Sequence, residues 1–442
     1  MEGGDGGREF GTYVSWALGV TTALLLILPM IFVVGKATHY SAYSSEGDYD
    51  GLAQLKDMRD SLEGDGYSIA NTMSTPMLVN DWKYPHRTML LVIAPEKPID
   101  ETEAESIYNF VTEMGGKVIV AADGTNANRL ASKFGVTYFD SPLLDENQYY
   151  ITENDDGTNQ YSWENVWGIG TMVEEAAEFG NDGCSAFDVD QFEDECALPV
   201  MFRKPTGMKF EQTERDREDP GHRDVIVISK ASPSAFIDLI GNGDSSDFRN
   251  PAPGDLALMI RADYPGIEVY DKVRAGQAIV GGDIGEVEVT GSIVFVSDPE
   301  AFSNMLWTDE VAQGEGIPRV CEVVGAYQSC WNDAFVNEEG HQWNGNGDYF
   351  RLLIESMMEH ENLDLAGEVR DYKSNFQVVF DESRHVTGVV SAPFVEAMST
   401  VVLLTSNTFL KWLVVLNVGL LLLVAMMIVP EKENWRHVFD LT

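Results

Sequence analysis

Residues 88–121 read TMLLVIAPEKPIDETEAESIYNFVTEMGGKVIVA, and this stretch decides the fold class. Its two ends, Thr88 to Ala94 and Lys117 to Ala121, are continuous apolar runs, which are typical of strands buried on both faces. Between them, Pro98 to Met114 has the pattern of a helix, with Asp100 as its N-cap and a pair of glycines at its end. A strand, a helix and a second strand in this order predict a parallel βαβ unit.

The same alternation of short apolar strands and helices continues on both sides of this unit. We expect helices over Asp48–Leu62, Asn126–Phe134, Ser234–Ile240 and Asp348–Glu359, and strands over Tyr67–Ala70, Val136–Tyr138, Asp224–Ser229, Leu256–Tyr270, Val273–Val289, Ser292–Ser297 and Asn375–Phe380. The pattern predicts an α/β fold with an open, mostly parallel sheet and helices on both faces.

Residues 140–222 interrupt this rhythm. The stretch is rich in acidic residues and holds Trp163, Trp167 and two of the four cysteines. A structureless loop of this length is unusual in a compact domain. We therefore interpret it as an acidic inserted subdomain.

The charge of the chain restricts the classes of molecule that it can bind. It carries 72 acidic and 29 basic residues, a formal net charge of −43. A surface this negative repels nucleic acid and anionic lipid, which argues against a nucleic-acid partner. The acidic residues spread through the middle of the chain, which is typical of an exported domain in salty, halophilic or marine surroundings, where salt screens self-repulsion. The alternative is that part of the acidic surface binds cations.

Two apolar segments predict membrane anchors. Val14 to Gly35 contains no charged residue, and Phe409 to Val429 contains only Lys411, near its outer edge. At about 1.5 Å per residue, each is long enough to cross a hydrocarbon core of about 30 Å as a helix. The first apolar run is longer than that of a cleaved signal peptide, so we interpret it as an uncleaved anchor.

The two spans place both termini on the same side of the membrane. The short tails carry Arg8, Lys432 and Arg436, which favours cytoplasmic tails and a large extracellular domain. The cysteines support an exported domain, because they form two close pairs, Cys184 with Cys196 and Cys321 with Cys330. We expect two disulfides, and the alternative is four buried free thiols.

The ends of the predicted strands are the places to look for a functional site, because open α/β sheets bind ligands beyond the carboxyl ends of their strands. Four such places carry polar side chains: Asp123 within Ala122–Asn126, the group Ser229, Lys230 and Ser232, the group Asp298, Ser303 and Asn304, and the group Asp381, Glu382, Arg384 and His385. The last group carries the most chemistry, because carboxylates and an imidazole serve as general acids, bases or ligands.

A purely structural role competes with each of these assignments. Aspartates at strand ends often cap turns, and Arg384 can simply pair with Asp381. The sequence contains no Walker A loop, GxGxxG, HExxH, GxSxG or CxxC motif, and its acidic stretches do not match an EF-hand loop. We therefore expect no metal and no cofactor, and we name Asp381, Glu382 and His385 as candidate catalytic residues and Asp123, Asp298, Asn304 and Arg384 as candidate ligand-binding residues.

Several of these segments resemble a known family. SAYSSEGDYDGLAQLKDMRDSLEGDGYSI (41–69), the 88–121 stretch, VFVSDPEAFSN (294–304) and VVFDESRH (378–385) resemble the membrane-anchored domain-of-unknown-function family 4350. That resemblance covers about 40–138, 224–240 and 292–385. It implies a flavodoxin-like, class I glutamine-amidotransferase-like domain, similar to the extracytoplasmic subunits of gliding-type ABC transporters. The family's acidic-His ending matches Asp381, Glu382 and His385.

The resemblance stops short of amidotransferase chemistry. A working glutamine amidotransferase needs a nucleophilic cysteine on a tight strand-to-helix turn. After the strand that ends at Ala121, this chain has Ala122 and Asp123 instead. Members of the family often accompany a MoxR-type ATPase, which implies a membrane complex as partner by analogy.

Three functions follow from these observations. The favoured one is a non-catalytic, membrane-anchored recognition or assembly domain of a cell-envelope complex. The alternatives are a subunit of an ABC transporter and a hydrolase with a carboxylate and histidine site. The expected organisation is a cytoplasmic tail (1–11), a span (12–35), an α/β domain in two parts (38–139 and 223–390) around the acidic insertion (140–222), a second span (408–429) and a second tail (430–442).

Overall fold

The computed structural model describes one compact unit of the chain, which lies within Thr38–Gly388. The described residues are 40, 42, 54–72, 79, 82–146, 148–153, 159–160, 162–171, 198–247, 250, 256–271, 285–308, 319–324, 327–331, 345–358 and 372–382. Both predicted spans lie outside them. Within these ranges, no helix has the length and apolar character needed to cross a membrane.

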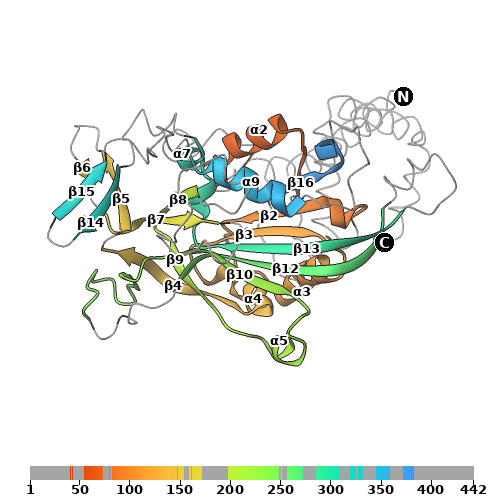
Figure 1. Ribbon diagram of the computed structural model, residues 1–442, viewed down its shortest axis with the longest axis horizontal. Coiled ribbons are helices and arrows are strands. Elements are labelled where there is room, and N and C mark those ends of the chain that lie inside the picture. Colours follow the sequence, from red (N-terminus) through yellow and green to blue (C-terminus); the bar gives the residue numbers. More distant parts are fainter. Residues whose placement is uncertain are drawn as a thin grey trace, which may run out of the picture. The chain divides into compact units, whose positions relative to one another are not determined.

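A ten-stranded mixed sheet forms the centre of this unit, in the order β1-β16-β2-β3-β13-β12-β9-β4-β11, with β10 paired to β12 (Figure 1). Its strands are β1 (Ser68–Thr72), β2 (Thr88–Ile93), β3 (Lys117–Ala121), β4 (Val136–Asp145), β9 (Thr206–Phe210), β10 (Asp224–Lys230), β11 (Ala235–Ile237), β12 (Ala257–Tyr270), β13 (Glu286–Val296) and β16 (Gln377–Asp381). The α/β class predicted from the sequence is confirmed.

Only part of this sheet is parallel. The neighbours β1, β16, β2, β3 and β13 run in one direction. From β13 onwards, β12, β9, β4 and β11 pair antiparallel. The sheet is therefore mixed, and the expectation of a mostly parallel sheet holds for its first five strands alone. The change occurs because β12 pairs antiparallel with β13 along almost its whole length. The other neighbours of β12, β9 and β10, also pair antiparallel with it.

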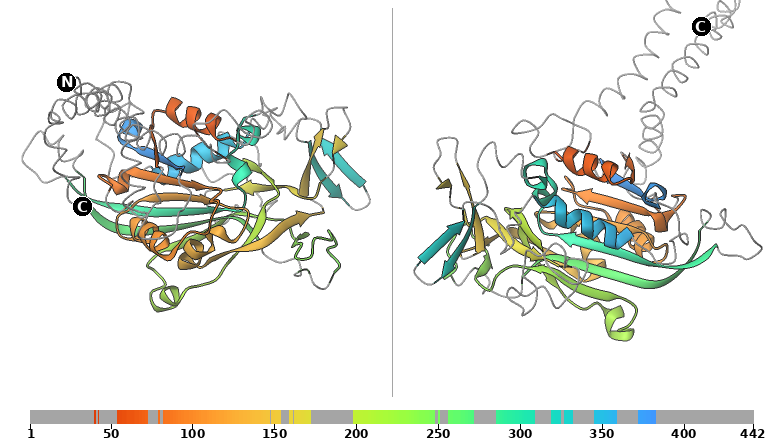
Figure 2. Two further views of the ribbon diagram at one scale, coloured as in Figure 1. Left: turned by 180° about the vertical axis from the view of Figure 1, so that it is seen from behind. Right: turned by 45° about the horizontal axis from the view of Figure 1, so that its top comes forward.

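Two crossovers place helices on opposite faces of the parallel block. Helix α3 (Glu101–Thr112) connects β2 to its neighbour β3, and helix α9 (Gly347–Met358) lies on the return path from β13 to β16. The two connections move in opposite directions across the sheet. Right-handed crossovers in opposite directions put their helices on opposite faces, and Figures 1 and 2 show α3 and α9 on the two sides of the sheet.

The buried side chains divide into two apolar cores, one on each face. Alternate residues of β2 go to different cores, with Met89 and Leu91 on the α9 face and Leu90 and Val92 on the α3 face. Helices α2 (Lys56–Gly64), α7 (Asn304–Trp307) and α9 cover the first core, whereas α3 and α4 (Asn128–Ala131) cover the second. Strand β2 is buried at every position, as its continuous apolar run predicts.

A smaller second sheet lies beside the main one, in the order β15-β14-β5-β7-β8, with β6 on β5. Its strands are β5 (Gln148–Glu153), β6 (Asn159–Gln160), β7 (Asn165–Gly170), β8 (Leu198–Arg203), β14 (Arg319–Val324) and β15 (Tyr327–Trp331). The stretch 140–222 thus contributes strands to both sheets, since β9 and the end of β4 belong to the main one.

Local sequence signals account for most element boundaries. Asp100 caps α3 and forms a capping box with Glu103, as expected for this position. The expected helix at Ser234–Ile240 is wrong, because β11 forms there by pairing with the end of β4. Asp348 lies in the first turn of α9, which already begins at Gly347. The remaining short helices are η3 (Pro85–Arg87), η4 (Thr125–Ala127), η5 (Ser132–Phe134), α5 (Glu214–Glu218), η8 (Pro299–Phe302) and η9 (Tyr372–Asn375).

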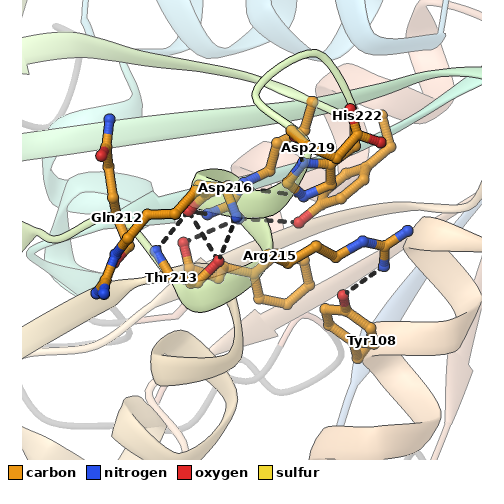
Figure 3. A network of polar contacts seen from close by, with 11 residues as sticks. Tyr108, Gln212, Thr213, Arg215, Asp216, Asp219 and His222 are labelled. Carbon is orange, nitrogen blue, oxygen red and sulfur yellow. Dashed lines mark hydrogen bonds and ion pairs between the residues drawn. The ribbon is translucent and has the colours of Figure 1, made fainter.

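A polar network holds α5 against the main sheet (Figure 3). Asp216 accepts hydrogen bonds from Arg223 at 2.6 and 2.7 Å and from the backbone N–H and hydroxyl of Thr213. Arg223 also donates to the Phe134 carbonyl in η5 and to the Tyr264 hydroxyl in β12. Burial opposes ionisation of Asp216, but the hydrogen bonds and the charge of Arg223 outweigh it and lower its pKa to about 2.

Replacement of Gly291 by Ala tests the close packing of α3 on the sheet. A Cβ at this position would lie 1.9 Å from the backbone oxygen of Val111 in α3. We expect G291A to lower the free energy of unfolding by at least about 2 kcal/mol, because backbone atoms must move to admit it. The measurement is denaturant unfolding followed by tryptophan fluorescence. G221A is the matched control, since a Cβ there meets no atom within 4 Å; equal stability of the two variants would contradict the packing.

The Asp216–Arg223 pair predicts a pH-dependent contribution to stability. The pKa of Asp216 is lower in the folded chain than its ordinary value of 3.8, so its contribution is present above about pH 4 and is lost as the pH falls towards 2. We expect D216N to cost about 1 to 2 kcal/mol at neutral pH, with the difference from the parent chain vanishing near pH 2. D219N, at an exposed neighbour, should cost little at either pH; a D216N deficit that persists at pH 2 would refute the assignment.

Candidate functional site

Three of the candidate residues lie at one edge of the main sheet. Strands β16, β2, β3 and β13 are parallel and in register, with Ile93 opposite Ala121 and Ala121 opposite Val296. Asp123, Asp298 and Asp381 therefore all lie at the carboxyl edge of the parallel block. The edge divides into two groups, however, because β2 and β3 separate β16 from β13, a distance of about 14 Å across three strand spacings.

Asp298 is the centre of the first group. The residue is 1% exposed, and its carboxylate accepts hydrogen bonds from the backbone N–H of Arg203, at the end of β8, and of Glu300, in η8. Asp298 thus ties the second sheet to the end of β13. Burial, and then the charge of Glu300, raise the pKa of Asp298 well above its usual range, although the two backbone hydrogen bonds oppose the change.

Charged and phenolic side chains surround this carboxyl group. Glu300 accepts hydrogen bonds from Arg203 Nη1 at 3.2 Å and from the Tyr40 hydroxyl at 3.4 Å. Asp123 is exposed, and its charge raises the pKa values of both Asp298 and Tyr40, after larger effects of burial and of Glu300. Asp123, Asp298 and Glu300 therefore form one acidic group that a single guanidinium partly neutralises.

Tyr150 of β5 adds a buried phenol to this group. Burial raises its pKa, and the nearby charge of Asp298 adds to the effect. Its hydroxyl and the Ser297 hydroxyl are buried without a hydrogen-bond partner within the described part of the chain. The surroundings of Asp298 thus keep polar groups away from bulk water, which favours the neutral, protonated form of the carboxyl group.

Asn304 has a structural role in this arrangement. Its side-chain carbonyl accepts the backbone N–H of Asp57 in the first turn of α2 at 2.9 Å, and its own N–H donates to the Gln54 carbonyl. The N-cap residue of α2 is Leu55, whose side chain cannot cap the helix. Asn304 supplies the missing capping hydrogen bond from another part of the chain.

Asp381 and Glu382 form the second group at the edge. Asp381 pairs in register with Thr72, and Glu382 donates its N–H to the Thr72 carbonyl. The Glu382 carboxylate accepts the backbone N–H of Ala42 at 2.8 Å. Since Tyr40 contacts Glu300 in the first group, residues 40 and 42 contact both groups along this edge.

Part of the predicted site lies outside the described residues. These positions are Arg384, His385, Cys184 and Cys196. Cys321 and Cys330 lie in β14 and β15, directly opposite one another in the antiparallel register. Opposed residues in such a ladder have Cα atoms about 4.5 to 5.5 Å apart, within the range that a disulfide requires, so this disulfide stays a prediction that the backbone allows.

The described residues at this edge provide neither a cluster of metal ligands nor an amidotransferase-type nucleophile. Within the ranges that the structure describes, no group of three or more His, Cys, Asp or Glu side chains could hold a metal ion. After β3, Ala122 is buried and Asp123 is exposed, and neither provides a nucleophile of the amidotransferase kind.

Sequence reasoning missed several members of the first group. Glu300 stood inside the quoted DPEAF run, two residues after Asp298, and that proximity was a usable signal. Tyr40, Tyr150 and Arg203 are far from Asp298 along the chain and reach it through the second sheet and through the segment before α2. No local pattern indicated those long-range contacts.

Comparison with known proteins gives no relative. No protein-family model, no curated protein and no solved structure matches the chain.

The acidic group around Asp298 can be tested by titration. Because Glu300 raises the pKa of Asp298, we expect E300Q to shift the titration of Asp298 to lower pH. Infrared difference spectroscopy of the protonated carboxyl stretch measures this, with D298N identifying the band. E113Q, at an exposed residue after α3, serves as the control and should leave the band in place. An Asp298 that titrates in its ordinary range in the parent chain would contradict the assignment.

Proposed function

We propose that the chain is a membrane-anchored recognition or assembly domain outside the cytoplasm, with a flavodoxin-like, glutamine-amidotransferase-like core and no catalytic activity of its own. The main support is that the polar residues at the carboxyl edge bind backbone groups of the protein itself. Asp298 and Glu382 accept backbone N–H groups, and Asn304 accepts one at α2. Side chains engaged in this way position the chain and leave few groups for chemistry.

The ends of the unit support anchoring at two points. Ala42 lies near the first predicted span in the sequence, and Glu382 lies before the second. Their contact at 2.8 Å brings the first and last described segments of the unit together at the carboxyl edge. Two anchors in one membrane are compatible with ends that lie this close, so the contact supports spans at 12–35 and 408–429.

The parallel block supports the resemblance in its architecture. Five parallel strands with α3 on one face and α9 on the other fit an open α/β domain of this general kind. Their order, β1-β16-β2-β3-β13, differs from the flavodoxin order, in which the first strand lies between the second and the third. Asp123 is exposed at the carboxyl edge, where such sheets bind their ligands. We therefore place the partner surface at Asp123. The partner is a protein of a membrane complex, with a transporter permease or a MoxR-type ATPase system as the specific candidates.

Co-purification tests this function. We expect the full chain, extracted in mild detergent, to carry at least one other membrane component in stoichiometric amount. D123K reverses a charge at the proposed surface and should reduce that component at least about tenfold, since a like-charge contact costs several kcal/mol at an interface. E113K reverses an exposed charge at the far end of α3 and should not. A clean monomer from the parent chain would count against the proposal, and a recovered permease would select the transporter alternative.

A further inference from the structure

A polar row crosses the α9 face of the sheet at the amino end of its parallel strands. The register places Asp224 of β10 opposite Asp263 of β12, Asp263 opposite Ser292 of β13, and Ser292 opposite Lys117 of β3. Register partners point to the same face, and Ile119 and Val294, two residues further along their strands, belong to the apolar core beneath α9. Four polar residues thus lie in one row beside an apolar core.

A cavity of about 270 Å³ opens at this row. Arg261, Asp263 and Ser292 line it from the sheet, and Ser356 lines it from α9. Arg261 donates to Asp263 at 2.8 to 3.0 Å and to the Ser356 hydroxyl at 3.1 Å, whereas Ser292 donates to Asp263 at 2.5 Å. Pro265 and Met357 add an apolar wall.

The charges around the cavity decide which ligand fits. Asp263 already pairs with Arg261, and Asp224 adds a second carboxylate to the lining, so the cavity repels anions. Arg261 in the wall opposes a cation. Lys117 donates to the His86 and Gly115 carbonyls and does not line the cavity. Burial lowers the pKa of Lys117 well below its usual range. The negative charge of Asp263 opposes this change, whereas the positive charges of Arg87 and Arg261 add to it. The Asp263–Arg261 pair is neutral overall, and Asp224 is exposed to solvent, which favours a neutral ligand.

The paired side chains favour a ligand with several hydroxyl groups. A carboxylate next to a guanidinium presents acceptors and donors side by side, which match adjacent hydroxyls of one molecule. Thr290 brings a further hydroxyl to the lining. The volume is below the range of about 300 to 1,000 Å³ that is usual for drug-sized ligands, so the ligand is small.

We propose that this cavity binds a neutral, polyhydroxylated molecule of monosaccharide size, with Asp263 and Arg261 as its main polar contacts. The proposal gives a ligand class to the recognition function and in that sense rests on it. It uses no property of the membrane anchors or of Asp123. If no protein partner is found, the sugar-binding proposal can still hold. If no sugar binds, the proposal of a protein partner can still hold.

Saturation-transfer difference NMR on the full chain in lipid nanodiscs tests it, since detergents with sugar headgroups would compete. The probes are D-glucose, D-mannose, D-galactose and N-acetyl-D-glucosamine, each compared with glucuronate and glucosamine as the charged counterparts. We expect at least one neutral sugar to bind with a Kd in the millimolar range and the charged analogues to bind more weakly.

Two variants locate the binding. D263N should weaken the sugar at least about tenfold, whereas E268Q, on an exposed position of the same strand, should leave its affinity unchanged. If D263N does not fold, S356A, which removes a lining hydroxyl from α9, should also weaken binding. Absence of saturation transfer from all four neutral sugars at up to ~100 mM, a preference for a charged analogue, or equal binding by D263N and the parent chain would each overturn the proposal.

Discussion

Strand β13 is the element on which the rest of the described unit depends. It pairs parallel with β3 on one side and antiparallel with β12 on the other, so it joins the parallel block to the antiparallel half of the sheet. Residues 291–299 of this segment are buried throughout. A strand with two different neighbours must satisfy two hydrogen-bonding patterns at once, which fixes its register on both sides.

The two ends of the buried part of β13 carry the two polar regions of the molecule. Ser292, at its beginning, belongs to the row beside α9, and Asp298, just after its end, ties β8 to the main sheet. Both are almost completely buried. A buried polar group costs free energy unless it has a partner, and each of these side chains obtains one from a different strand. Polar residues at the ends of an apolar strand therefore connect layers that the apolar core alone would not align.

The sequence predicted the elements whose signals are local. The continuous apolar runs at 88–94 and 117–121, the cap at Asp100 and the strand near 375–380 depend on neighbours within a few residues, and all of them form. The region around Ser234 did not follow its local pattern. There, pairing with the end of β4 outweighs a weak helical preference and produces a short strand.

The candidate site shows the same division. The carboxyl ends of parallel strands were enough to predict that Asp123, Asp298 and Asp381 share an edge. Which of them interact is a long-range property, since Arg203 and Tyr40 meet Glu300 across separations of 97 and 260 residues. The row from Asp224 to Lys117 was equally hidden, because its members are far apart along the chain and only the register of four strands brings them together.

The buried basic residues near this row contrast with the net charge of −43. Basic residues are scarce in the chain, yet Arg87 and Lys117 are almost fully buried and Arg261 is largely covered. An acidic surface keeps a protein soluble in salt, but it does not explain why basic side chains are buried. A buried cation costs free energy unless a carboxylate compensates it, as Asp271 does for Arg87, whereas the Lys117 side chain donates to the His86 and Gly115 carbonyls. The cavity at Arg261 opens beside these buried basic residues, and it is there that we propose a ligand binds.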